Sequence, residues 1–151
     1  MTAEQFGKKM VELLPRLVRG IASRESNYLS KGKITLPQLW ALEYLSREGD
    51  RPVNELARFL RISRPAATGL TDRLISQGLI RRQGDSRDRR VVQIGATPKG
   101  KRIVAHIWTQ KSRMFAEFFE PISEPERAQY LAILQKVVKN LDEPIKKRGA
   151  R

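Results

Sequence analysis

The fold of this chain is decided by residues 54–100, which read NELARFLRISRPAATGLTDRLISQGLIRRQGDSRDRRVVQIGATPKG. The beginning of this stretch predicts a short helix that Asn54 caps, followed by a tight turn at residues 61–62. A second helix follows Ser63, a favourable N-cap residue, and Gly78 ends it. Two short helices joined by such a turn form a helix-turn-helix, which can place its second helix in the major groove of DNA.

The second half of the stretch predicts a basic β-hairpin directly after the second helix. Residues 79–83 and 91–94 have the composition of strands, and the charged segment 84–90 joins them. Residues 58–102 hold twelve Lys/Arg against three Asp/Glu, which accounts for +9 of the formal net charge of +14. A charge of this size and sign indicates a polyanion as the partner.

Length and composition predict one compact unit, residues 1–151. A chain of this length can bury one good core, and 40% hydrophobic with 30% charged residues is typical of a globular protein. The positive charge favours nucleic acid first, an anionic membrane second and an acidic protein third. No apolar run approaches the ~18 residues of a membrane span and no signal-peptide core is present, so we expect a cytoplasmic protein.

The chain has no cysteine and one histidine, His106. The absence of cysteine excludes disulfides, thiolate nucleophiles, thiol redox sensing and cysteine-ligated zinc. One histidine cannot form a histidine-rich metal site or a convincing catalytic dyad, so we expect His106 at an interface or on the surface. We predict no metal and no cofactor.

Long amphipathic helices are predicted before the helix-turn-helix. Apolar residues at spacings of three and four predict a helix over residues 3–29, which Pro15 should kink or break near Leu14. A loop at residues 29–33 follows. A capping box at residues 35–38 then opens a central, buried helix that runs to about residue 47.

Two more long helices are predicted after the hairpin. The first runs over residues 97–119, and a second capping box at residues 123–126 opens a helix that reaches about residue 145. Residues 146–151 form a basic tail. The apolar stripes of residues 3–29 and 97–145 exceed what one module can cover, which predicts that they pack on a second copy of the chain. The alternative is the all-α core of a monomer.

The second helix of the helix-turn-helix has a slim, polar first half, which close approach to base edges requires. Arg64 could pair bidentately with guanine, and Ala66 and the threonine methyls could touch thymine methyls. Gly69 costs ~1 kcal/mol relative to alanine in mid-helix, and it either permits close backbone approach or is merely tolerated. The predicted major-groove residues are Ser63, Arg64, Pro65, Ala66, Thr68, Gly69, Thr71 and Arg73.

The hairpin loop predicts a different contact. Arg87, Arg89 and Arg90 crowd the tip, where they suit the narrow, negative minor groove or the phosphates beside it. Asp88 is interpreted as a brace that pairs with a neighbouring arginine and aims it. An arginine run on its own is more often a solvated surface, but this one directly follows a helix-turn-helix pattern.

Several spaced motifs between residues 35 and 100 resemble, in the same order, the landmarks of the MarR (multiple antibiotic resistance regulator) family. They are Leu36-Pro37-Gln38-Leu39, Glu55-Leu56-Ala57, Asp72-Arg73-Leu74, Gly78-Leu79-Ile80-Arg81, Asp85 with Asp88-Arg89-Arg90, and Thr97-Pro98-Lys99-Gly100. The flanking helices agree by pattern only. Two positions depart from the family: Gly69 stands where many members carry a large polar or basic residue, and Ala96 stands where leucine is usual.

The resemblance implies a mainly α winged helix-turn-helix with a small β-hairpin wing, acting as a homodimer on a pseudo-palindromic operator. It implies that Arg89 and Arg90 reach the minor groove or its phosphates, and that the first, fifth and sixth helices form the dimer. Many members also lose DNA affinity when a small amphipathic compound or aromatic acid binds between the dimer helices and the DNA-reading module.

Candidate residues for such a ligand pocket are Met10, Leu14, Arg16, Trp40, Tyr44 and Trp108. Arg16 or Arg19 would be the carboxylate partner, and each apolar candidate could equally be plain core. The family's cysteine-based oxidation switch is excluded because the chain has no cysteine. A single histidine argues against its zinc-sensing variant.

We therefore predict a homodimeric, sequence-specific DNA-binding regulator, a repressor that a small ligand releases. Residues 35–100 form its DNA-binding module, and residues 3–29 and 97–145 form its dimerisation helices. The first alternative is a nonspecific architectural nucleic-acid-binding protein, for which the charge alone would suffice. An enzyme is disfavoured because no paired carboxylates, activated nucleophile or phosphate loop are found, and a membrane-surface protein because the arginines gather on a loop.

Overall fold

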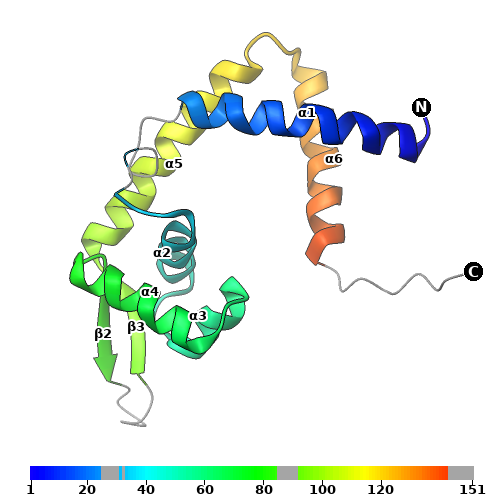
Figure 1. Ribbon diagram of the computed structural model, residues 1–151. Helices are drawn as coiled ribbons and strands as arrows, with labels where there is room; N and C mark the ends of the chain where they lie inside the picture. The colour runs from blue at the N-terminus through cyan, green and yellow to red at the C-terminus, as the bar shows by residue number, and fades with distance from the viewer. Residues whose placement is uncertain (25–30, 32, 85–91, 143–151) are drawn as a thin grey trace, which may run out of the picture. The chain divides into compact units, whose positions relative to one another are not determined.

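The computed structural model describes residues 1–24, 31, 33–84 and 92–142. These residues form mainly helices with a small antiparallel sheet, which confirms the predicted fold class (Figure 1). The chain divides into two compact units, residues 1–112 and 113–151. In chain order the elements are α1 (Ala3–Arg24), α2 (Leu36–Glu48), β1 (Arg51–Pro52), α3 (Val53–Leu60), α4 (Arg64–Ser76), β2 (Ile80–Gly84), β3 (Val92–Ala96), α5 (Pro98–Phe119) and α6 (Glu124–Asp142).

The core of the first unit is built around α2, as the sequence predicted. Leu42 and Leu45 of α2 are fully buried, together with apolar side chains from α3, α4, the sheet and the start of α5. The side-chain carbonyl of Gln38 accepts a hydrogen bond from the N–H of Thr35 at 2.8 Å, which confirms one arm of the predicted capping box. Gly49, with a φ of 78°, ends the helix.

The helix-turn-helix consists of α3 and α4, but the start of α3 differs from the prediction. The helix begins at Val53, so Asn54 lies inside its first turn and is not the cap. Pro52 occupies the cap position with extended backbone angles, and the helix therefore begins two residues earlier than a cap at Asn54 would place it. Ser63 is the cap of α4 as predicted: its hydroxyl accepts from the N–H of Ala66 at 3.3 Å.

The sheet has three antiparallel strands in the order β1-β3-β2. β2 and β3 form the predicted hairpin, with Ile80 opposite Ala96 and Gly84 opposite Val92, and they lie side by side in Figure 1. Each strand is shifted by one or two residues from the expected bounds. β1 was not predicted, because it has only two residues and one of them is a proline.

α1 is a continuous helix from Ala3 to Arg24, with Pro15 inside it. Of the two outcomes expected at Pro15, a break is therefore wrong, and a kink near Leu14 stays a prediction. The proline removes the hydrogen-bond donor for the carbonyl of Val11, and because Val11 is highly exposed, water can satisfy that carbonyl. No residue of α1 is buried within the described parts of the chain. The predicted extension to residue 29 and most of the loop 29–33 lie outside the described residues.

The second unit contains the last turns of α5 and the whole of α6. The N–H of Ser123 donates to the carboxylate of Glu126 at 3.1 Å, which confirms one arm of the second capping box. The Ser123 hydroxyl donates to the same carboxylate, and the two hydrogen bonds lower the pKa of Glu126. The guanidinium of Arg127 donates to the carbonyl of Phe119 at 3.2 Å, and the rings of Phe119 and Tyr130 lie 5.2 Å apart. These contacts fix the turn between the two helices. The predicted end near residue 145 and the basic tail lie outside the described residues.

Candidate nucleic-acid interface

The first half of α4 exposes the slim surface that the sequence predicted. Arg64, Pro65, Ala66 and Gly69 are exposed, and Thr68 is partly buried with its hydroxyl donating to the carbonyl of Arg64 at 3.0 Å. Arg73 is also exposed, further along the helix. Small side chains dominate this face of α4. The helix backbone can therefore come close to base edges on the floor of a DNA groove.

Thr71 does not belong to this surface, and its assignment as a major-groove residue is wrong. The residue is 0% exposed and lies with Ala67 and Leu74 on the face of α4 that is buried in the core. Its hydroxyl donates to the carbonyl of Thr68 at 2.8 Å, so the buried oxygen is satisfied within the helix. Thr71 lies four residues after Ala67 and three before Leu74. This helical spacing, and not the polarity of the side chain, places Thr71 on the buried face.

Gly69 offers a test that separates the fold from DNA binding. A Cβ atom added to Gly69 would meet nothing within 4 Å, so Gly69→Ala should raise the free energy of unfolding by ~1 kcal/mol through its effect on helix propensity. Thermal unfolding measures this gain, and a lower melting temperature would show that the fold itself needs glycine here. A titration of the same variant with DNA then shows whether the added methyl group obstructs the groove.

The two arginines of β2 are held by carboxylates from opposite directions. Arg82 Nη2 lies 2.8 Å from Asp72 Oδ1 of α4, which links the hairpin to the second helix of the helix-turn-helix. Arg81 Nη2 donates to both carboxylate oxygens of Asp50, at 2.8 and 3.1 Å. Neighbouring residues of a strand point to opposite faces, so the two pairs brace the two faces of the hairpin. Sequence reasoning missed both pairs, because neither carboxylate lies near its arginine along the chain.

Gly95 makes room for the Asp50–Arg81 pair. It lies directly opposite Arg81 in the β2–β3 register. A Cβ atom on Gly95 would lie 1.9 Å from Asp50 Oδ1 and 2.9 Å from Arg81 Nη1. The ion pair therefore crosses the sheet over a position that only glycine can occupy without moving the two side chains.

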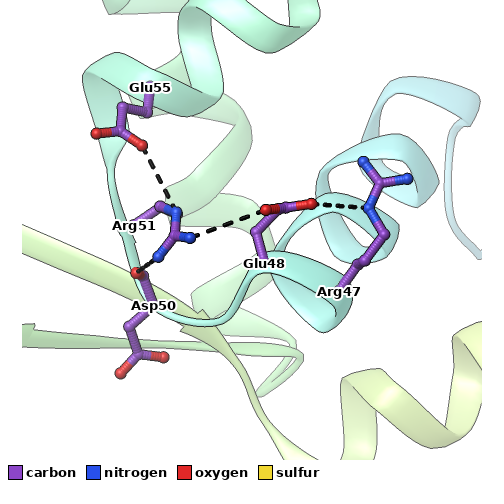
Figure 2. Close-up of polar contacts among 5 residues, drawn as sticks. All are labelled: Arg47, Glu48, Asp50, Arg51 and Glu55. Carbon is purple, nitrogen blue, oxygen red and sulfur yellow. Dashed lines mark hydrogen bonds and ion pairs between the residues drawn. The ribbon is translucent and has the colours of Figure 1, made fainter.

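A chain of polar contacts joins the end of α2 to the start of α3 (Figure 2). Arg51 lies at its centre: Nη1 donates to the carbonyl of Asp50 at 3.0 Å, and other guanidinium nitrogens lie 3.8 Å from Glu48 and 3.6 Å from Glu55. Glu48 also accepts from Arg47 Nε at 2.8 Å. Because β1 pairs with β3, these contacts connect α2, the helix-turn-helix and the hairpin at one point.

The arginines of the helix-turn-helix stand in contrast to those of β2. Arg58, Arg61, Arg64 and Arg73 are exposed, and none makes an ion pair with an acid in the part of the chain that the structure describes. No described acid neutralises their charges, which can therefore meet an external polyanion. The predicted loop residues 87–90 lie outside the described residues.

The candidate ligand-pocket residues occupy several elements of the first unit. Met10, Leu14 and Arg16 are exposed along α1. Trp40 of α2 is 46% exposed. Two further candidates have specific partners: the ring of Tyr44 stacks on Phe59 of α3 with centroids 4.4 Å apart, and Trp108 Nε1 of α5 donates to Glu43 of α2 at 2.9 Å.

His106 is exposed on α5, as expected. Within the described ranges, no group of three or more His, Asp or Glu residues is placed to hold a metal ion. Among the helices described, none is both long and apolar enough to cross a membrane.

The sequence and the structure were compared with those of known proteins. Residues 33–91 match the sequence model of the MarR family. The chain is 30% identical over 128 residues to the uncharacterized HTH-type transcriptional regulator YsmB of Bacillus subtilis, a match that covers 85% of each chain. The chain belongs to the MarR family. It is a DNA-binding transcriptional regulator of the helix-turn-helix type and not an enzyme.

Other similar proteins match along most of the chain. The HTH-type transcriptional repressor MdtR of Bacillus subtilis is 26% identical over 136 residues, which cover 90% of this chain and 88% of MdtR. A MarR family protein from Bacillus stearothermophilus, solved as a structure, is 29% identical with a TM-score of 0.79 and covers 95% of this chain and 100% of that one. The MepR transcription regulator of the Staphylococcus aureus multidrug efflux pump MepA is 25% identical with a TM-score of 0.68, over 86% of this chain and 96% of MepR.

Proposed function

We propose that this MarR-family protein is a homodimeric repressor that recognises a pseudo-palindromic operator and is released by a small ligand. One observation carries the DNA-binding part of the proposal: the capped, slim first half of α4 is exposed, and the arginines around it have no acidic partner among the described residues. A surface of this kind suits insertion into the major groove, with the cations close to the phosphates.

The proposed major-groove contacts come from the exposed part of the predicted set. Arg64 and Ala66 are best placed to meet base edges, while the exposed Arg73 is suited to phosphate. The arginines of the loop, Arg89 and Arg90, are proposed to contact the minor groove or its phosphates. Thr71 is omitted because it is buried. The proposed set is Ser63, Arg64, Pro65, Ala66, Thr68, Gly69 and Arg73, with Arg87, Asp88, Arg89 and Arg90 in the loop.

Dimerisation through α1, α5 and α6 is supported by apolar surface that each unit leaves exposed. α1 carries large exposed apolar residues along its length, and so does α6. Such stripes are unfavourable in water and mark surfaces that another chain covers. The exposed residues are Phe6, Met10, Val11, Leu13, Leu14, Leu17 and Val18 of α1, and Tyr130, Leu131, Ile133, Leu134, Val137, Val138 and Leu141 of α6.

Release by a ligand is supported by exposed aromatic side chains of α2, α3 and α5. Trp40 and Trp108 are each about half exposed, and Tyr44 of α2 stacks on Phe59 of α3. Aromatic rings with polar tips suit a small amphipathic molecule. The proposal of a repressor is supported by MdtR, a relative that carries that description.

Competition between DNA sequences tests the proposed function. The protein is bound to a labelled promoter fragment at moderate salt, and bulk DNA or the same unlabelled fragment is added as competitor. A sequence-specific regulator should prefer its operator by a factor of ~10³ or more, and the complex should contain two chains per operator. A preference of only a few-fold would instead favour the nonspecific architectural protein.

A further inference from the structure

Arg61, in the turn between α3 and α4, has an unusual backbone conformation for its residue type. Its φ and ψ angles of 54° and 42° lie in the left-handed region, and within the described residues it is the only residue other than glycine with a positive φ. This region is unfavourable for a side chain with a Cβ atom, and glycine or asparagine is the usual occupant. The turn therefore carries arginine where glycine would be less strained.

The left-handed turn is closed by backbone hydrogen bonds, and no hydrogen bond or ion pair of the Arg61 side chain is found among the described residues. The N–H of Arg61 donates to the carbonyl of Arg58 at 3.1 Å, and the N–H of Ile62 donates to Ala57 at 3.0 Å, so backbone bonds alone close α3. Glycine could form the same bonds. The Arg61 side chain is exposed and makes no ion pair with any acid that the structure describes. The guanidinium of Arg61 is therefore available to a partner outside the chain, as far as the described residues go.

The position of Arg61 indicates what that contact is. Arg61 lies two residues before Ser63, the cap of α4, between the exposed cations Arg58 and Arg64. If α4 enters the major groove by its N-terminal half, the turn before it lies at the rim of the groove, where the phosphates run. We propose that Arg61 binds a DNA phosphate at this rim. This inference rests on the proposed function.

The arginines of β2 differ from Arg61 in having acidic partners. Arg81 and Arg82 lie in the same module, but each is bound within hydrogen-bonding distance to a carboxylate, so their charges are already balanced. Arg61 has no such partner among the described residues. The structure thus separates arginines that hold the module together from an arginine available to the backbone of DNA.

Arg61→Gly tests the proposal, because the two consequences of the change have opposite signs. Thermal unfolding should show an unchanged or higher melting temperature, since the strain is removed. Affinity for DNA should fall by roughly eight-fold at 0.1 M salt, and the slope of log affinity against log salt should decrease by ~0.9, the amount for one phosphate. The loss should be equal for operator and bulk DNA, because a phosphate contact carries no sequence information.

Two control variants complete the experiment. Arg61→Lys retains the charge and should keep most of the salt slope, whereas Lys136→Ala on α6 removes one exposed charge outside the DNA-binding module and should leave the slope unchanged. An Arg61→Gly variant with wild-type affinity and slope would overturn the proposal, and so would a lower melting temperature. The wild-type protein is measured in parallel. If the wild type prefers its operator and Arg61→Gly has the same affinity and salt slope as the wild type, only the inference about Arg61 fails. If the wild-type protein shows no preference, the proposed function fails, and the salt slope on bulk DNA still tests Arg61.

Discussion

Gly100→Ala should destabilise the protein by about 1–3 kcal/mol, the usual cost of forcing an extra group into a packed core. A Cβ atom at this position would lie 2.2 Å from the carbonyl oxygen of Leu79 and 3.1 Å from Leu42 Cδ2. The first of these is a backbone atom, so no rotation of a side chain relieves the clash. The first turn of α5 therefore needs glycine where it passes the beginning of the hairpin.

The clash would also disturb the bonds that anchor α5. The same Leu79 carbonyl accepts from the N–H of Thr97 at 3.0 Å and from its hydroxyl at 3.1 Å. The Thr97 hydroxyl in turn accepts from the N–H of Gly100 at 3.1 Å. Differential scanning calorimetry should show a melting temperature several degrees below that of the wild type, and Gly69→Ala is the matched control with the opposite sign. A Gly100→Ala protein as stable as the wild type would contradict the described packing of α5.

Replacing Arg89 and Arg90 by alanine should weaken binding to every DNA sequence by roughly 60-fold at 0.1 M salt, if each arginine neutralises one phosphate. The physical reason is the loss of counterion release: two contacts contribute a slope of ~1.8 in log affinity against log salt. The proposal rests on the sequence, because these residues lie outside the described ones. A salt titration by fluorescence anisotropy measures both quantities.

The matched control for the wing is a double variant of equal charge, Lys136→Ala with Lys139→Ala on α6. It changes the net charge of the protein by the same amount and should leave the slope close to that of the wild type. If the two double variants showed the same small loss of affinity, the effect would reflect overall charge, and the assignment of Arg89 and Arg90 as DNA contacts would be wrong.

Local signals in the sequence predicted most of the fold. Ser63 and Ser123 were identified as helix caps because a cap depends on residues only three positions apart, and the structure contains both. Asn54 was misassigned because Pro52 already supplies the extended residue before α3. β1 was missed since two residues show no periodicity.

The candidate site was predicted less completely, because parts of it depend on contacts between distant residues. Thr71 was assigned to the DNA surface on the strength of its polar side chain, whereas its spacing from Ala67 and Leu74 places it in the core. Asp50 lies 31 residues before Arg81, so no local pattern reveals their ion pair. The one available signal was an otherwise unexplained glycine, Gly95, whose missing side chain makes room for that pair.

The arginine count in the sequence did not distinguish arginines that pair with acids inside the module from arginines that are exposed. All the arginines of residues 58–102 contribute equally to the charge of the module. The structure divides them, because Arg81 and Arg82 are paired with acids while Arg58, Arg61 and Arg64 are exposed without an acidic partner in the described parts of the chain. The DNA surface is therefore expected to centre on the helix-turn-helix, with the loop arginines beside it.

Selection from a random library of DNA duplexes tests the central claim most directly. The purified protein is mixed with the library at moderate salt, and the retained duplexes are sequenced over successive rounds. A dimeric winged helix-turn-helix should enrich an inverted repeat whose half-sites lie about one helical turn, ~34 Å, apart. Retention of duplexes without any common sequence, however tightly they bind, would contradict the assignment as a sequence-specific regulator.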